Sequence, residues 1–137
     1  MDPKGFPLLM LEYNCNILNW NIRGLNNPVR RKVVRDLVSE TKATIVALQE
    51  TKLEHVDAAL VSEILGTCFV QNFVVLPAIG TRGGILLGTN EEHYKIVSAE
   101  VGVHTVTATV QAISGGGRCG ASLLSMAHKM IKRNCNS

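Results

Sequence analysis

Apolar and polar residues alternate through residues 17–22, ILNWNI, with the two-residue period of a half-buried strand. Turn-forming residues, GLNN, follow this segment. Asn27 suits the N-cap of a helix, and Pro28 suits its first position, where a missing N–H is not needed. The residues after Pro28 have helical periodicity. The apolar face of this helix would consist of Val29, Val33, Val34, Leu37 and Val38. Its opposite face would carry Arg30, Arg31, Lys32 and Arg35.

A continuous apolar run at residues 43–48, ATIVAL, predicts a strand that is covered on both faces. A second helix is expected over residues 55–65, ending at Gly66. Its inward positions would be Val56, Ala59, Leu60 and Ile64. Further strands are expected at residues 68–76, 84–88, 94–101 and 105–113, the last of which alternates apolar residues with threonine. The inward positions of that last strand would be Val106, Ala108 and Val110.

The order of these elements predicts an α/β fold with a mixed sheet. Strand, helix, strand and helix come first, so the first strands should pair in parallel through a helical crossover. Several strands then follow in succession, which favours antiparallel hairpins. The glycine run at residues 115–117 indicates a boundary, after which a short basic amphipathic helix is expected at residues 121–132. The apolar side of that helix would be Leu123, Leu124, Ala127, Met130 and Ile131.

Composition narrows the class of protein without identifying it. The 46% hydrophobic content is enough for a packed core, and the 4% aromatic content means that aliphatic residues must build it. The net charge of +3 is too small to indicate a nucleic-acid partner by itself. After Glu100 the chain has no acidic residue, and a solvated basic face is the ordinary interpretation of such a tail. Its basic residues are Arg118, Lys129, Lys132 and Arg133.

The cysteines and the hydropathy favour an intracellular protein without a membrane span. No two of the four cysteines form a C-x-x-C pair. The gaps between Cys119, His128 and Cys135 do not fit known zinc modules. We therefore expect reduced thiols and an intracellular location, with the compartment left open and the nucleus among the candidates. No apolar run reaches the roughly 18 residues of a membrane span, and residues 7–11 do not have the form of a signal peptide.

Polar clusters end two of the predicted strands, WNIRG at residues 20–24 and LQETK at residues 48–52. Ligands of open α/β sheets bind outside the carboxyl ends of the strands, so the two clusters could share one crevice. The Asn21 amide oxygen and the Glu50 carboxylate are hard ligands of the kind that Mg²⁺ takes. Lys52 could offer a point charge to phosphate. The alternative is structural: Asn21 caps a turn and Glu50 begins a loop.

The segment ILNWNIRGLNNPVRRKVVRDLVSETKATIVALQETKL resembles the opening of endonuclease/exonuclease/phosphatase domains. It most resembles the apurinic-type endonucleases of plant non-LTR (LINE-type) retrotransposons. In that family an apolar strand ends in W-N-x-x-G, a helix follows, and a second apolar strand ends in L-Q-E-T-K. Residues 82–84, RGG, resemble a later family segment, and the resemblance runs from about residue 14 to 112. It implies the first half of a DNase I-like α/β sandwich over residues 14–113, preceded by an N-terminal extension at residues 1–13.

The resemblance also implies an activity and its residues. Asn21 matches the family asparagine beside the metal and the scissile phosphate, and Glu50 matches the glutamate that binds Mg²⁺. Gln49 and Lys52 match supporting positions. Arg23 stands where some relatives have aspartate, so no role is assigned to it. The implied function is Mg²⁺-dependent phosphodiester cleavage, with DNA as the partner.

Two later family motifs are absent from these 137 residues. One is a G-D-x-N element that orients the attacking water, and the other is a D-H pair. The aspartates present are Asp2, Asp36 and Asp57, none of them in such a context, and His104 alone suits a surface or core position better than a general base. Phosphodiester hydrolysis needs positioned water, charge stabilisation and proton transfer together. We therefore expect weak or absent Mg²⁺ binding and an inactive or very weak enzyme.

Residues 114–137 do not resemble the family, which indicates a truncated retroelement copy or a fused exon. Half of a sandwich would leave an apolar sheet face uncovered, so self-association is expected. One alternative function is nucleic-acid binding without cleavage, through the first helix and the basic tail. Another is partner docking by the last helix. Residues 115–120, GGGRCG, also satisfy G-x-G-x-x-G, but no acidic residue follows to bind a ribose, which excludes a dinucleotide site.

Overall fold

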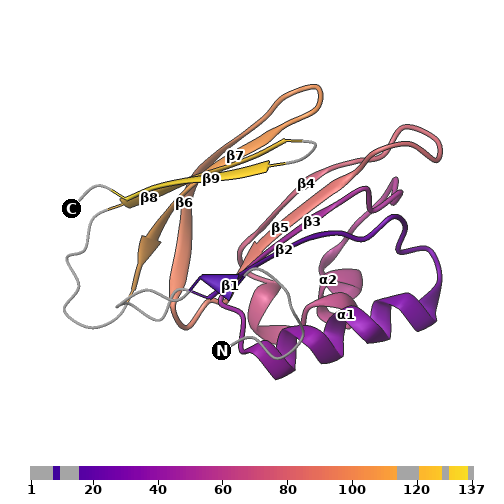
Figure 1. Cartoon of the computed structure of the whole chain (residues 1–137), viewed down its shortest axis with the longest axis horizontal. Coiled ribbons are helices and arrows are strands. Elements are labelled where there is room, and N and C mark those ends of the chain that lie inside the picture. The colour runs from indigo at the N-terminus through magenta and orange to yellow at the C-terminus, as the bar shows by residue number, and fades with distance from the viewer. Residues whose placement is uncertain (1–7, 10–15, 114–120, 128–129, 136–137) are drawn as a thin grey trace.

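The computed structural model describes residues 8–9, 16–113, 121–127 and 130–135. Two β-sheets face each other, and two α-helices cover the other side of the first sheet (Figure 1). The first sheet has the strand order β1-β2-β3-β5-β4, and the second has the order β6-β7-β8-β9. The first part of the chain forms β1 (Leu8–Leu9), β2 (Ile17–Asn21), α1 (Pro28–Thr41), β3 (Ile45–Gln49), α2 (Ala58–Ile64), the 3-10 helix η1 (Thr67–Phe69), β4 (Phe73–Leu76) and β5 (Ile85–Thr89). The second sheet consists of β6 (Tyr94–Val101), β7 (Val106–Ala112), β8 (Ala121–Ala127) and β9 (Met130–Cys135).

The first sheet is mixed, as the element order predicts. β2 and β3 run parallel and are joined by the α1 crossover, whereas β5 is antiparallel to both β3 and β4. Every residue of β3 is buried, which confirms the prediction of a strand covered on both faces. β1 pairs antiparallel with β2, so part of the predicted N-terminal extension is an edge strand of this sheet.

Helix α1 begins where the sequence predicts. The Asn27 side chain accepts a hydrogen bond from the Val29 backbone N–H at 2.8 Å, and Pro28 is the first helical residue. The predicted apolar face is only partly correct. Val34, Leu37 and Val38 are buried, but Val29 is 70% exposed and Val33 is 48% exposed. At 3.6 residues per turn these two valines lie roughly 140° and 100° around the helix from Val34, outside the stripe that meets the sheet.

The segment after α1 and β3 differs in detail from the prediction. Helix α2 begins only after Asp57, whose side chain accepts from the Leu60 N–H at 2.9 Å. Val61 and Ile64 are its buried residues, whereas Ala59, predicted to face inward, is exposed. The single strand predicted at residues 68–76 is divided into η1 and β4. Phe69, at the end of η1, is buried in the core that includes residues of α1 and α2. The apolar residues before β4 therefore belong to a packed turn and not to a strand.

Two apolar cores result from the alternation of side chains along β2 and β3. Leu18, Val46 and Leu48 join the core between the first sheet and the helices. Ile17, Ile45 and Ala47 join the core between the two sheets. The second sheet contributes Tyr94 to that core together with the predicted inward set of β7, Val106, Ala108 and Val110. The face of the first sheet that was expected to be uncovered is therefore packed against the second sheet.

The prediction of a helix at residues 121–132 is wrong. This part of the chain forms β8 and β9, which extend the second sheet from the edge of β7. In β8, Leu124 is the backbone partner of Ala108, and Met126 is the partner of Val106. Without β8, the edge of β7 would have unpaired N–H and C=O groups. Pairing these groups stabilises a strand here more than the helical periodicity of the sequence stabilises a helix. The glycine run at residues 115–117 lies outside the described residues.

Candidate functional site

The carboxyl ends of β2 and β3 lie side by side in the first sheet. Asn21, the last residue of β2, is the backbone partner of Gln49, the last residue of β3. Adjacent strands are about 4.8 Å apart, and partners in register share a face. Asn21 and Gln49 therefore lie on the face of the sheet that meets the second sheet. The Gln49 side-chain amide also donates to the Asn19 side-chain oxygen at 3.1 Å, across the same pair of strands.

Glu50 comes next after Gln49, and its backbone changes the direction of its side chain. Strict alternation would place Glu50 on the helical side with Leu48. Glu50 instead has φ 57°, in the left-handed region, and its half-buried side chain lines the same cavity as Gln49. The structure therefore brings Asn21, Gln49 and Glu50 to one edge of the sheet, although Asn21 is not among the residues that line the cavity.

Backbone hydrogen bonds hold the segment around Glu50 from both sides. On the β2 side, the Gly24 N–H donates to the Glu50 carbonyl at 2.7 Å. On the β5 side, the Thr51 N–H donates to the Gly84 carbonyl at 3.1 Å, and the Lys52 N–H donates to the Gly83 carbonyl at 2.8 Å. This segment continues the sheet's hydrogen bonding past the end of β3, so the position of Glu50 is fixed by its neighbours rather than by a free loop.

Gly84 is the residue that permits this close approach. A Cβ at Gly84 would collide with the Thr51 hydroxyl and would lie 3.1 Å from the Lys52 backbone nitrogen. Its φ of +99° is also unfavourable for any residue with a side chain. The second glycine of the RGG segment is therefore required by the packing of the strand that carries Glu50.

Left-handed backbone is concentrated at this edge of the sheet. Four described non-glycine residues have positive φ, and three of them are Arg23, Glu50 and Lys52, with φ of 57°, 57° and 60°. The fourth, Lys42, is the ordinary left-handed cap of α1. Such conformations cost on the order of 1–3 kcal/mol each and concentrate at functional sites. The strained backbone therefore lies at the same edge of the first sheet as the W-N and L-Q-E-T-K motifs.

A cavity of about 610 Å³ opens beside Glu50. One wall is the end of β3, with Gln49, Glu50 and Lys52. A second wall is the turn between β4 and β5, which includes Arg82, and the third comes from the turn between β6 and β7. One carboxylate, that of Glu50, thus shares the cavity with the cations of Lys52 and Arg82. This charge pattern suits a metal-bound phosphate group.

Two residues of this cavity had no role assigned from the sequence. Arg82 is held at the tip of the β4–β5 turn, where its backbone exchanges two 3.0 Å hydrogen bonds with Ile79. The resemblance of residues 82–84 to a family segment was the available signal for it. His104 lines the cavity from the β6–β7 turn and is exposed, in agreement with a surface position. Nothing in the sequence around His104 indicates this location.

The residues present fit half of a magnesium site. Mg²⁺ commonly takes only one or two protein carboxylates and completes its shell with water and substrate phosphate. Glu50 can supply a carboxylate from the cavity, and Asn21, paired with the preceding residue Gln49, can supply an amide oxygen from the end of the adjacent strand. Within the described ranges no group of three or more His, Cys, Asp and Glu side chains could hold a metal ion. The arrangement therefore fits an ion shared with a phosphate better than an ion fully enclosed by protein.

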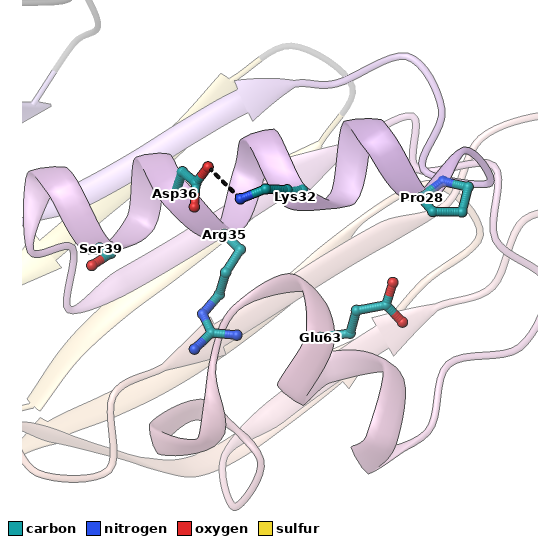
Figure 2. A pocket seen from close by; sticks show the side chains of 6 residues that line it. All are labelled: Pro28, Lys32, Arg35, Asp36, Ser39 and Glu63. Atoms are coloured by element: carbon teal, nitrogen blue, oxygen red, sulfur yellow. Dashed lines mark hydrogen bonds and ion pairs between the residues drawn. The ribbon is translucent and has the colours of Figure 1, made fainter.

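A second hollow lies between α1 and α2 (Figure 2). Its volume is about 430 Å³, and its lining is mostly polar. Lys32 and Asp36, one turn apart on α1, form an exposed ion pair of 3.3 Å across part of it. Such pairs on helix surfaces are ordinary solvated contacts. The cations of this groove are used within the protein, because Lys32 pairs with Asp36 and Arg35 donates to the Ser62 carbonyl. The cavity at Glu50 is therefore the better candidate for a ligand site. The lining residues are Pro28, Lys32, Arg35, Asp36, Ser39 and Glu63.

The fold and the polar edge together define an α/β sandwich of the DNase I type, with a mixed sheet, helices on its outer face and a second sheet opposite. The sequence profile described as the Endonuclease/Exonuclease/phosphatase family matches residues 18–125, and the chain belongs to this family of nucleases and phosphodiesterases. The match extends past residue 113, the domain boundary predicted from the sequence, into β8. No curated protein matches the chain. In the described part of the chain, no helix has the length and apolarity needed to span a membrane.

Proposed function

We propose that this chain carries the metal- and phosphate-binding half of a Mg²⁺-dependent DNA endonuclease site, of the kind found in LINE-type retrotransposons of plants. The observation that carries the proposal is the pairing of Asn21 with Gln49 at the ends of two parallel strands, which places Glu50, the next residue, at the same edge of the sheet. Membership of the family supplies the reaction class, which is phosphodiester hydrolysis. The cations at the cavity supply the complementary charge for a nucleic-acid backbone.

Each residue has a distinct part in this proposal. Glu50 binds the metal ion through its carboxylate, and Asn21 presents its amide to the ion and to the scissile phosphate. Lys52 attracts the phosphate as a point charge, and Gln49 orients the edge through its bond to Asn19. When bound, Mg²⁺ would polarise the phosphoryl oxygen and neutralise developing charge.

We expect this chain to bind the metal ion and the nucleic acid without cleaving the phosphodiester bond. Hydrolysis also needs a group that orients water and a group that transfers a proton. In the family these functions belong to the G-D-x-N and D-H motifs, which these 137 residues do not contain. We therefore expect substrate and metal to be held weakly, with cleavage absent or very slow.

A plasmid-nicking assay with Mg²⁺ tests the proposal of inactivity. Wild-type protein should leave supercoiled plasmid intact over hours at micromolar concentration. Nicking that survives purification and disappears in Glu50→Ala would show that the half-site is catalytically competent. Glu92→Ala is the matched control, because Glu92 is exposed in the turn between β5 and β6 and lies outside the Glu50 cavity.

Nucleic-acid binding without cleavage is the second candidate, and the contacts of the α1 cations favour the cavity over the α1 face as its surface. The basic residues of α1 make contacts within the protein: Arg30 and Arg31 donate to loop carbonyls, Lys32 pairs with Asp36, and Arg35 donates to Ser62. The cavity cations, Lys52 and Arg82, are the better contacts for phosphate. Salt-dependent DNA binding that weakens in Arg82→Gln but not in Lys32→Gln would favour this candidate.

A further inference from the structure

The third and fourth residues of helix α1 are arginines, whose positive charge is unfavourable near the N-terminus of a helix. The N-terminus of a helix carries a partial positive charge and favours acidic residues. The first turn of α1 contains no acidic residue, and Arg30 and Arg31 follow Pro28 and Val29 directly. A cation in this position costs stability unless another contact offsets it. The hydrogen bonds of the Arg30 and Arg31 side chains show which contacts offset this cost.

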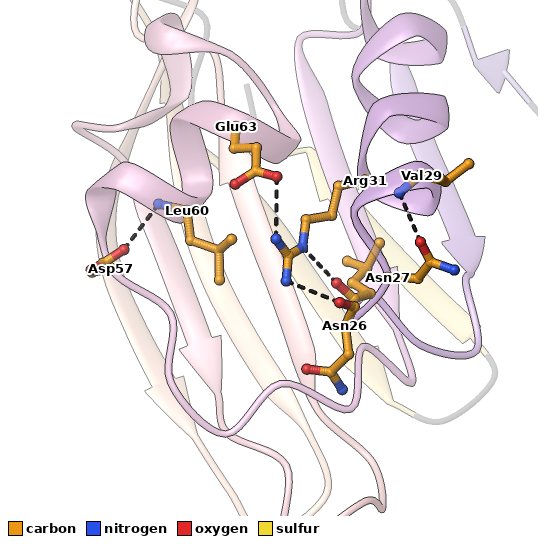
Figure 3. Close-up of polar contacts among 8 residues, drawn as sticks. Asn26, Asn27, Val29, Arg31, Asp57, Leu60 and Glu63 are labelled. Carbon is orange, nitrogen blue, oxygen red and sulfur yellow. Dashed lines mark hydrogen bonds and ion pairs between the residues drawn. The ribbon is translucent and has the colours of Figure 1, made fainter.

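Arg31 reaches back from α1 to the loop that follows Asn21 (Figure 3). Its Nε–H donates to the Leu25 carbonyl at 2.7 Å, and its Nη2 donates to the Asn26 carbonyl at 3.2 Å. Nη1 forms a 3.2 Å ion pair with Glu63 on α2, and the Arg31 side chain is only 19% exposed. The guanidinium therefore joins α1, α2 and this loop at one point. Three donors in a fixed planar fork make such a contact possible.

Arg30 holds the preceding part of the same loop. Its Nη1 donates to the Ile22 carbonyl at 2.9 Å and to the Arg23 carbonyl at 3.2 Å. Residues 22–26, which we call the site loop, thus have four of their carbonyls bound by the two arginines. These bonds satisfy carbonyls that the sheet no longer pairs.

The N–H groups of the site loop point the other way, to the segment that carries Glu50. The Ile22 N–H donates to the Gln49 carbonyl at 3.0 Å, the Gly24 N–H to Glu50 at 2.7 Å, and the Leu25 N–H to Thr51 at 2.8 Å. The Asn26 side chain adds a 2.8 Å bond to the Lys52 carbonyl. The site loop is therefore held between the arginines of α1 on one side and the end of β3 on the other.

We propose that Arg31, assisted by Arg30, is a positioning residue for the metal site, because it presses the site loop against the backbone of Glu50. This proposal rests on the proposed function, in which Asn21 and Glu50 share an ion. Arg30 and Arg31 contact loop carbonyls and Glu63, and neither lines the Glu50 cavity. They fix the backbone that directly follows Asn21, so the spacing between the two ligands depends on them. The same contacts offset the unfavourable charge at the start of α1.

The loop-holding part of the proposal is tested without any metal, by amide hydrogen exchange. Arg31→Met keeps the apolar stem and removes the donors, and Arg31→Lys keeps the charge without the fork. We expect the Gly24 and Leu25 amides to exchange about tenfold faster in Arg31→Met, with a smaller change in Arg31→Lys. The β3 amides should be unchanged. Lys32→Met, one residue along α1 and outside the loop contacts, should leave all of these rates as in wild type.

The effect on the ion is tested by Mn²⁺ affinity, measured from the relaxation of water protons. Arg31→Met should bind Mn²⁺ about fivefold to tenfold more weakly, Arg31→Lys should recover part of the loss, and Lys32→Met should match wild type. Glu63→Gln should have a smaller effect than Arg31→Met, because it leaves both carbonyl bonds in place. If wild type binds Mn²⁺ and Arg31→Met binds it equally well, the positioning role is overturned. If wild type binds no Mn²⁺, the proposed function fails, and hydrogen exchange still decides whether Arg31 holds the loop.

Discussion

The backbone N–H of Gly24 donates to the carbonyl oxygen of Glu50 at 2.7 Å, which joins the two polar strand ends of the first sheet. Through this bond the loop after Asn21 and the segment after Gln49 form one continuous structure. The left-handed backbone at Glu50 then turns its carboxylate toward the cavity between the sheets. The backbone conformation and hydrogen bonds at this edge of the sheet therefore determine where the side chains of the candidate site lie.

Gly84→Ala should be strongly destabilising, and Gly83→Ala provides a matched control. Both glycines have positive φ, 99° and 74°, so each substitution introduces strain on the order of 1–2 kcal/mol. Only at Gly84 would the new methyl group also meet Thr51 and Lys52, whereas nothing lies within 4 Å of a Cβ at Gly83. Urea unfolding should therefore show a loss at least about 1 kcal/mol larger for Gly84→Ala than for Gly83→Ala. Equal losses would mean that this packing does not constrain the Glu50 segment.

Asn27→Ala should lower the free energy of unfolding by about 1 kcal/mol, because the N-cap of α1 is lost. The Asn27 side chain accepts from the Val29 N–H at 2.8 Å. The first turn of α1 has two arginines and no acidic residue, so no side-chain charge there compensates for loss of the cap. Val29→Ala serves as the control, because Val29 is 70% exposed and its truncation should cost little. A change below about 0.3 kcal/mol for Asn27→Ala would contradict the capping role.

Truncation after residue 113 should increase self-association. Removal of β8 leaves the edge of β7 without its partner strand, and an unpaired edge is a template for pairing with another chain. Sedimentation velocity should show a monomer for the full chain at low concentration and concentration-dependent larger species for the truncated chain. A Gln111→Lys substitution, at an exposed position of β7, should reduce the association if the edge causes it. A truncated protein that stays monomeric would show that β8 is not needed to protect β7.

Much of the fold follows from patterns that are local in the sequence. Asn27 and Pro28 mark the start of α1 because capping depends on adjacent residues. The uninterrupted apolar run of β3 reports burial on both faces. The alternation at Val106, Ala108 and Val110 correctly predicts the inner face of β7. The L-Q-E-T-K and W-N motifs also located the edge on which Asn21 and Glu50 lie, although their chemical roles stay predictions.

What the sequence did not reveal depends on contacts between distant segments. β8 forms by pairing with the edge of β7, and β9 by pairing with β8. The helical periodicity at residues 121–132 gives no sign of this pairing. Val29 and Val33 have the composition of a core face, but the sheet meets a narrower stripe of α1. The requirement for glycine at Gly84 arises from Thr51, far away in the sequence. The arginines of α1 resemble a nucleic-acid-binding face in the sequence, yet their donors are used by loop carbonyls.

The central claim is that Asn21 and Glu50 act on one divalent cation. Paramagnetic broadening by Mn²⁺ in ¹⁵N-labelled protein tests it most directly, with Glu50→Gln as the variant that keeps shape and removes charge. We predict that substoichiometric Mn²⁺ broadens the Asn21 side-chain amide and the Glu50 backbone amide in wild type. Both effects should disappear in Glu50→Gln, and they should stay unchanged in Glu92→Gln, because Glu92 is exposed and lies outside the Glu50 cavity. Broadening that spares Asn21, or that persists in Glu50→Gln, would contradict a shared cation at these two strand ends.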